Sequence, residues 1–268
     1  MRADQFLVAN GYLPSREQAK KQIVSGDVLC DGKPIRKPSE EIPDGAHTVE
    51  IRNPMRYVGR GGWKLEAAIK RFSMDISGLT ALDIGASTGG FTDCLLQHGA
   101  KHVFAVDAGE GQLAEKLRSD PRVTSMEHCN ARYLTAAQIG RRVPLIVMDV
   151  SFISATCILP VFPELLEDGG EAVLLIKPQF EVGRAMIGKG GIVKDPRAHR
   201  AAVERVLEAG VRLGLVPTDL CRSPVTGGDG NVEFLIRFRK ETGCLSRVDE
   251  ATVRAVTEKQ WSGEESSV

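Results

Sequence analysis

Two charged residues stand at the ends of apolar segments, where charge is costly. Asp149 follows the apolar residues 144–148, and Lys177 follows the apolar residues 172–176. Both segments are typical of buried strands, so the two side chains should meet at the carboxyl edge of one sheet. An unpaired charge is unfavourable there, so the two residues either form a structural ion pair or belong to a functional site. These two residues alone leave both interpretations open.

Two further charged residues favour a functional site. Lys64 falls in the first turn of a predicted helix, where the helix dipole disfavours a cation by roughly 0.3–1 kcal/mol. Glu233 stands near the start of an otherwise apolar strand, after the turn-rich residues 226–231. A solvated lysine and a carboxylate on an edge strand would be the simpler explanation of each residue alone. Together, four charged residues beside apolar segments favour a functional site over separate structural explanations.

A glycine-rich turn indicates a cofactor site. The string Asp83-Ile-Gly85-Ala-Ser87-Thr-Gly89-Gly follows a predicted strand and opens a helix, so its backbone can approach a ligand closely. About 20 residues further on, Asp107 ends the next strand, where a carboxylate can bind a ribose diol. The turn and the acid together indicate an adenosine-containing cofactor, either a nicotinamide dinucleotide or S-adenosylmethionine. The alternative is that backbone amides alone satisfy both aspartates.

The spacing favours S-adenosylmethionine. The string G-A-S at residues 85–87 replaces the G-x-G that accommodates a pyrophosphate. Short-chain dehydrogenases have a similar glycine string, but they need a tyrosine with a lysine four residues later. None of the three tyrosines of this chain has such a lysine: Tyr12, Tyr57 and Tyr133.

The glycine-rich string looks like the first motif of S-adenosylmethionine-dependent methyltransferases, and four residues match in chain order the Lys-Asp-Lys-Glu tetrad of FtsJ-type ribose 2′-O-methyltransferases: Lys64, Asp149, Lys177 and Glu233. The resemblance implies that the four residues are catalytic, with Lys177 taking the proton of the ribose hydroxyl and the two carboxylates orienting the lysines. Base-methylating relatives carry Asn/Asp-Pro-Pro-aromatic where this chain has Asp149-Val-Ser-Phe, which favours ribose. The resemblance also implies the cofactor-binding residues: Asp83, Gly85, Ser87, Gly89, Asp107 and Asn130.

Seven predicted strands position these residues, and amphipathic segments lie between most of them. The strands are expected over residues 80–84, 102–107, 122–126, 144–149, 171–177, 215–221 and 232–239. This alternation predicts an α/β fold, with a doubly wound, parallel, seven-stranded Rossmann-like methyltransferase sheet. A C-terminal extension follows, with a helix expected over residues 248–260.

The first 58 residues predict a small N-terminal α+β domain. Two short helices over residues 2–10 and 16–25 precede the hairpin signal Asp31-Gly32. The basic second helix and the string V-L-C-D-G-K-P resemble the RNA-binding module of the ribosomal protein S-four type, also called the alpha-L motif. The resemblance implies that this domain binds structured RNA through shape and phosphate contacts.

Basic residues in several regions are candidates for contacting RNA. Those on the second helix form one patch, although such a patch is more often a solvated face. The glycine-rich segment 182–194 is interpreted as a basic lid rather than as a merely flexible surface loop. The predicted RNA-binding residues are Arg2, Arg16, Lys20, Lys21, Arg60, Arg184 and Lys189.

Considered together, the two regions resemble the TlyA family of rRNA cytidine 2′-O-methyltransferases, often labelled hemolysins. The expected division is an RNA-binding domain over 1–58, a linker over 59–62, an FtsJ-like methyltransferase domain over 63–241 and an extension over 242–268. The family implies methylation of a cytidine ribose in ribosomal RNA of the small subunit, the large subunit or both. The alternatives are a non-catalytic RNA-binding or ribosome assembly factor, and a hemolysin.

Composition excludes several other classes of protein. The 268 residues carry 35 Lys+Arg and 35 Asp+Glu, and 42% are hydrophobic, as in soluble globular proteins. No apolar run approaches the roughly 18 residues of a membrane span. The six cysteines are far apart and form no C-x-x-C pair, so neither a disulfide framework nor a zinc site is expected. We therefore expect a cytoplasmic enzyme that works on ribosomal RNA without a membrane or a metal ion.

Overall fold

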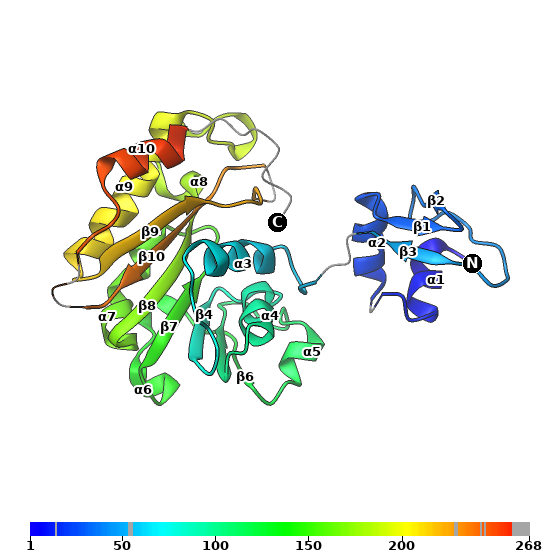
Figure 1. Cartoon of the computed structure of the whole chain (residues 1–268), viewed down its shortest axis with the longest axis horizontal. Coiled ribbons are helices and arrows are strands. Elements are labelled where there is room, and N and C mark those ends of the chain that lie inside the picture. The colour runs from blue at the N-terminus through cyan, green and yellow to red at the C-terminus, as the bar shows by residue number, and fades with distance from the viewer. Residues whose placement is uncertain (14, 53–55, 228–229, 242, 244, 259–268) are drawn as a thin grey trace. The chain divides into compact units, whose positions relative to one another are not determined.

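The chain forms two compact units, Met1–Arg56 and Tyr57–Val268 (Figure 1). The computed structural model describes residues 1–13, 15–52, 56–227, 230–241, 243 and 245–258. The first unit is a small α+β domain and the second contains the large sheet.

The first unit packs two helices on a small sheet. Its elements are α1 (Ala3–Ala9), α2 (Arg16–Val24), β1 (Val28–Cys30), β2 (Lys33–Pro34) and β3 (Val49–Ile51). The strands lie in the order β2-β1-β3, and both pairs are antiparallel. Leu7 and Ile23 bring the helices together over Val28 in one small apolar core. The turn between β1 and β2 contains Asp31 and Gly32, both at positive φ, as the Asp-Gly signal predicted.

The second unit is built on seven strands in the order β6-β5-β4-β7-β8-β10-β9. Their bounds are β4 (Thr80–Ile84), β5 (His102–Val106), β6 (Val123–Met126), β7 (Val143–Met148), β8 (Leu166–Ile176), β9 (Val216–Arg222) and β10 (Phe234–Arg239). The neighbours from β6 to β8 are parallel, but β10 runs antiparallel to both β8 and β9. The expectation of a wholly parallel sheet is therefore wrong for β10. The α/β fold class itself is confirmed.

Helices cover both faces of this sheet (Figure 1). They are α3 (Gly61–Arg71), α4 (Gly90–Gln97), α5 (Glu115–Arg118), α6 (Ala136–Ile139), α7 (Phe162–Leu165), α8 (Pro178–Glu181), α9 (Pro196–Arg212) and α10 (Glu250–Glu258). Side chains of α3 and α4 join one apolar core, and those of α6, α7, α9 and α10 join the other. Residues 145–148 of β7 alternate between the two cores, because side chains of a strand point to opposite faces. The sheet is thus buried on both sides.

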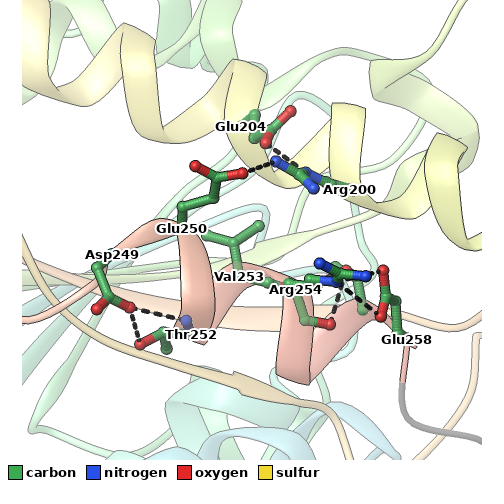
Figure 2. Close-up of polar contacts among 9 residues, drawn as sticks. Arg200, Glu204, Asp249, Glu250, Thr252, Val253, Arg254 and Glu258 are labelled. Carbon is green, nitrogen blue, oxygen red and sulfur yellow. Dashed lines mark hydrogen bonds and ion pairs between the residues drawn. The ribbon is translucent and has the colours of Figure 1, made fainter.

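The C-terminal helix α10 packs against α9 (Figure 2). Asp249 accepts hydrogen bonds from the backbone N–H and the hydroxyl of Thr252, which satisfies a donor at the start of the helix. Val253 is buried in the main core, and Arg200 of α9 pairs with Glu250 at 2.8 Å. The expected helix over 248–260 is observed at Glu250–Glu258, and residues 259–260 lie outside the described part. This extension is a packed part of the second unit.

Residues 59–62, expected as a linker, are partly helical. Helix α3 begins at Gly61, and a Cβ at Gly62 would collide with the ring of Tyr57. The absence of a side chain at this position therefore lets the chain before the helix fold back on it.

None of the five cysteines within the described residues forms a disulfide, and Cys244 lies outside them. Among the described helices, none combines the length and the apolar character needed to cross a bilayer.

Candidate active site

The glycine-rich turn between β4 and α4 lies directly against the loop that follows β7. Gly85 has φ 82°, in the left-handed region that favours glycine. A Cβ at this position would lie 2.6 Å from the backbone oxygen of Asp149. The turn therefore brings bare backbone to the carboxyl edge of the sheet, where ligands of open α/β folds bind.

Two adjoining cavities open at this edge. The larger has a volume of about 400 Å³ and the smaller of about 190 Å³. They share a set of lining residues: Gly85, Ser87, Asp149 and Ser151. Asp107 and Asn130 line the larger cavity, whereas Lys177 and Arg60 line the smaller one. Four of the expected cofactor residues and two of the expected catalytic residues, Asp149 and Lys177, thus line these adjoining cavities.

Asp107 is held by backbone amides and keeps capacity for a ligand. Its Oδ2 accepts from the Ser87 N–H at 2.8 Å and its Oδ1 from the Gly109 N–H at 2.7 Å. An ionised carboxylate offers about four acceptor positions, so each oxygen can accept another hydrogen bond. The arrangement fixes the carboxylate at the wall of the larger cavity and leaves acceptor positions open there.

Asp83 and Gly89, also expected to bind the cofactor, line neither cavity. Asp83 is fully buried, and the Thr92 hydroxyl donates to its Oδ2 at 2.6 Å. Its Oδ1 has no hydrogen-bond partner among the described residues, and burial raises the pKa of Asp83 to about 7. Gly89 caps α4 with φ 94°, and a Cβ there would collide with Leu117. Both residues therefore lie at the glycine-rich turn without lining a cavity, Asp83 through its bond to Thr92 and Gly89 as the cap of α4.

The four expected catalytic residues are brought together as two linked pairs. Lys177 Nζ lies 2.6 Å from Asp149 Oδ1, and Lys64 Nζ lies 2.5 Å from Glu233 Oε2. The pairs are joined by a distance of 3.9 Å between Lys64 Nζ and Asp149 Oδ2. Each charge therefore has an opposite charge nearby, which offsets the cost of partial burial.

The Lys64–Glu233 pair is the more deeply buried of the two. The Glu233 side chain is 2% exposed and Lys64 9%. Burial raises the pKa of Glu233, against the lowering effect of the Lys64 ammonium beside it. Lys64 and Glu233 line neither cavity, whereas Lys177 lines the smaller one. The Lys64–Glu233 pair therefore contacts the site through Asp149.

Sequence reasoning missed Ser151. Lys177 Nζ donates a hydrogen bond to Ser151 Oγ at 2.7 Å, and Ser151 lines both cavities. Its sequence signal was its place two residues after Asp149, within the string Asp149-Val-Ser-Phe, where a serine by itself usually indicates a loop. Ser151 and Asp149 together fix the direction of the lysine amine.

Comparison with known proteins identifies the family. The sequence model of the FtsJ-like methyltransferases matches residues 57–240, and that of the S4 domain matches residues 1–47. The chain belongs to the FtsJ-like methyltransferase family. These matches confirm the expected small N-terminal module, the methyltransferase class and its cofactor, S-adenosylmethionine.

Full-length relatives share both regions of this FtsJ-like methyltransferase. YqxC of Bacillus subtilis, named as an rRNA methyltransferase, is 47% identical over 88% of this chain and 85% of its own. The 16S/23S rRNA (cytidine-2′-O)-methyltransferase TlyA of Mycobacterium tuberculosis is 42% identical over 96% of this chain and 97% of its own. A solved structure of a hemolysin-named protein from Streptococcus thermophilus has a TM-score of 0.76 at 41% identity, covering 96% of this chain and 94% of that one.

Several expected RNA-binding residues of the methyltransferase's first unit carry intramolecular ion pairs. Arg2 and Arg16 both contact the buried Asp4, at 3.0 and 3.1 Å. The Arg2 hydrogen bond lowers the pKa of Asp4 to about 2, so the carboxylate stays ionised. Lys21 lies 2.9 Å from Glu17. These pairs reduce the positive potential that the cations alone would give. The prediction from the sequence counted the cations without their acidic partners.

Lys20 is exposed on the same helix, α2. In the second unit Arg60 lines the smaller cavity, while Arg184 and Lys189 are exposed on the glycine-rich segment after α8.

A buried asparagine anchors the end of that segment. Asn231 Oδ1 accepts from the Val193 N–H at 2.9 Å, and its Nδ2 donates to the Gly191 carbonyl at 3.0 Å. His199 contacts the Val193 carbonyl at 2.9 Å through Nε2. Asn231 is 1% exposed and stands two residues before Glu233. The segment bearing Arg184 and Lys189 is therefore bonded to the loop that carries Glu233, one of the expected catalytic residues.

The expectation that the FtsJ-like methyltransferase uses no metal stays a prediction. Within the described residues, the ligand atoms of Cys30, Asp31 and His47 lie within 4.8 Å of one another. His47 already contacts Asp31 at 2.6 Å, and this bond accounts for the raised pKa of His47. A hydrogen-bonded His–Asp pair therefore explains the contact at the centre of this group.

Proposed function

We propose that this chain transfers a methyl group from S-adenosylmethionine to the 2′-hydroxyl of a cytidine in ribosomal RNA of the small subunit, the large subunit or both. The observation that carries the proposal is the placement of Lys177. Its amine stands at the wall of the site, held by Asp149 and Ser151, with the Lys64–Glu233 pair behind it. This placement suits activation of a hydroxyl group rather than simple RNA binding.

A ribose hydroxyl is a weak nucleophile near neutral pH, so it must lose its proton and be aligned with the methyl group. S-adenosylmethionine supplies, when bound, a methyl group on a positively charged sulfur. Lys177 is the proposed proton acceptor. Asp149 and Ser151 hold its amine in place, and the charge of Lys64 stabilises the developing alkoxide.

The residues around the larger cavity fit the cofactor. Gly85 and Ser87 present backbone and a hydroxyl group at the junction of the two cavities, where the methionine part would lie. Asp107 would bind the ribose, and Asn130 would lie near the adenine. Asp83 and Gly89 would act indirectly, by shaping the turn.

The substrate class is supported by the small domain and by the relatives. The M. tuberculosis relative is named for cytidine methylation in 16S and 23S rRNA, and it shares 42% of residues over nearly its whole length. We propose that Lys20, Arg184 and Lys189, together with the ion-paired arginines of the first unit, contact RNA phosphates. Work on ribosomal RNA would place the protein in the cytoplasm, as the scattered free cysteines suggest.

The hemolysin name of some relatives is not favoured. A hemolytic or a purely RNA-binding protein has no need of two lysines ion-paired at the edge of a cofactor-sized cavity. The paired tetrad therefore supports catalysis over both alternatives.

Methyl transfer to purified ribosomal subunits tests the proposal. Small and large subunits lacking the modification are incubated separately with the protein and labelled S-adenosylmethionine. We expect label in 2′-O-methylcytidine of at least one subunit, and a loss of at least about 100-fold with Lys177→Ala. Lys101→Ala, an exposed lysine before β5 and at the opposite edge of the sheet, should leave the rate unchanged. Cofactor binding without transfer to either subunit would overturn the proposed substrate.

A further inference from the structure

A buried carboxylate beside the site has no part in the chemistry described above. Glu181 ends the short helix α8, four residues after Lys177, and is 3% exposed. Its Oε2 accepts from the Ser154 hydroxyl at 2.5 Å, and its Oε1 accepts from the Ala155 N–H at 2.7 Å. A buried carboxylate is costly unless it is hydrogen-bonded, and these two bonds to the same loop offset that cost.

Those bonds close a set of contacts between two segments. One segment runs from Asp149 to Ala155 after β7, and the other runs from Lys177 to Glu181 after β8. At one end of the set, Lys177 contacts both Asp149 and Ser151. At the other end, Glu181 holds Ser154 and Ala155.

The middle of the set is aromatic and strained. The rings of Phe152 and Phe180 lie 5.4 Å apart between centroids. Phe152 has φ 64°, which is unusual for a residue with a side chain, so the loop carries local backbone strain at this position.

The Ser154 end of the loop has its own local structure. Ser154 Oγ accepts from the Thr156 N–H at 3.2 Å while its hydroxyl group donates to Glu181. Ala155 is 2% exposed and opens a turn of 3-10 helix. Without the carboxylate, the buried Ala155 N–H would lose its acceptor. Glu181 thus supplies the acceptor for both donors at this end of the loop.

We propose that Glu181 is a positioning residue, which fixes the loop after β7 so that Asp149 and Ser151 meet the amine of Lys177. This inference rests on the proposed function. It assigns Glu181 no contact with substrate or cofactor. It states that the geometry of the catalytic lysine is set from both ends of a seven-residue loop, and that Glu181 is the anchor at the far end.

Rescue by an isosteric amide separates positioning from charge. The amide of Glu181→Gln can accept from the Ala155 N–H and donate to Ser154 Oγ, whereas Glu181→Ala can do neither. Glu164→Ala is the matched control, because Glu164 also accepts from a backbone N–H, that of Ala136, but lies outside the site. The full-length chain is used throughout, below the melting temperature of every variant.

Single-turnover methyl transfer is measured at saturating cofactor and RNA, together with the KM for RNA. We expect Glu181→Ala to slow the rate roughly tenfold to 100-fold with little change in KM, because misplacement of a catalytic group acts on the chemical step. The rate of Glu181→Gln should stay within about threefold of the wild-type rate, and Glu164→Ala should have the wild-type rate. A wild-type rate in Glu181→Ala, or equal losses in Glu181→Ala and Glu181→Gln, would overturn the inference.

Amide hydrogen exchange at Ala155 keeps the test independent of the substrate. Loss of the acceptor should speed this exchange by about tenfold or more in Glu181→Ala, with wild-type protection in the control variant. If the wild-type chain methylates neither subunit, the proposed function fails. The exchange rate at Ala155 still tests whether Glu181 holds the loop. Unchanged exchange at Ala155 in Glu181→Ala would overturn the anchor whatever the substrate is.

Discussion

Lys64 Nζ lies 2.5 Å from Glu233 Oε2, although 169 residues separate them in the chain. The contact joins the first turn of α3 to the residue before β10, and both side chains are almost fully buried. The unfavourable position of a cation at a helix start is thus offset by a carboxylate from the other end of the domain.

Removing one member of this pair should therefore cost stability as well as activity. Breaking a buried ion pair from one side leaves an uncompensated charge, which costs about 3–5 kcal/mol. We expect this loss in the free energy of unfolding of Glu233→Gln, measured by urea denaturation. Glu241→Gln, which removes a half-exposed partner of Arg239, should stay within about 0.5 kcal/mol of wild type. Equal stability of the two variants would contradict the buried pair.

The pH dependence of the chemical step distinguishes two actions of Lys177. A neutral amine can accept a proton, whereas an ammonium group acts only through its charge. If Lys177 is the base, the single-turnover rate should rise with pH, with cofactor and RNA kept saturating. A rate that does not change with pH would mean that Lys177 acts only through its positive charge.

A methyl group at Gly85 should damage the cofactor site. Gly85→Ala places Cβ 2.6 Å from a backbone oxygen and also strains a left-handed residue. The strain alone costs roughly 1–2 kcal/mol. Gly78→Ala is the matched control, since Gly78 has φ 73° and open space around it. Calorimetric titration should show weaker S-adenosylmethionine binding for Gly85→Ala and wild-type binding for Gly78→Ala, and equal binding would exclude the close approach.

Asp83 should make stability depend on pH near neutrality. Its pKa is about 7 in the folded chain and near 3.8 when solvated, so the folded state binds the proton more tightly between these values. Stability from this group is therefore complete below about pH 4 and falls as the pH rises toward 7. Asp83→Asn cannot titrate, so we compare its free energy of unfolding with that of wild type. The difference, wild type minus variant, should decrease between about pH 5 and about pH 8. A constant difference would show that Asp83 is ionised throughout.

Asn231 should control the segment that bears Arg184 and Lys189. Asn231→Ala leaves the Val193 N–H and the Gly191 carbonyl without their partner, at a cost of about 1–3 kcal/mol. Trypsin should then cut after Arg184 and Lys189 faster than in wild type. Asn10→Ala, which removes an exposed side-chain bond to the Phe6 carbonyl, should not change the cutting rate at these two sites.

The meeting of Asp149 and Lys177 could be predicted from the sequence because these candidate catalytic residues follow a simple rule. Asp149 and Lys177 each end an apolar strand, and such ends meet at one edge of a parallel sheet. Which lysine pairs with which carboxylate was beyond reach, since that depends on side chains brought together across the fold. The same limit hid the Asp4 contacts of Arg2 and Arg16.

The direction of β10 could have been read from the chain. Parallel neighbours need a crossover of a dozen residues or more, usually a helix. The segment between Arg222 and Phe234 is rich in turn residues and contains no amphipathic helix pattern. It therefore suits a hairpin, and β9 and β10 are indeed antiparallel.

The reversed strand β10 also sets when the enzyme becomes complete during its synthesis. Because β10 runs against its neighbours, its beginning lies at the edge where β7 and β8 end, and this brings Glu233 to Lys64. Yet β10 is made after β9 and inserts between β8 and β9 in space. A nascent chain can fold the earlier parallel strands while still attached to the ribosome that makes it. Lys64 gains its partner Glu233 only when residues 233–239 have emerged and entered the sheet, so a chain that ends before them carries the glycine-rich turn without the complete set of candidate catalytic residues.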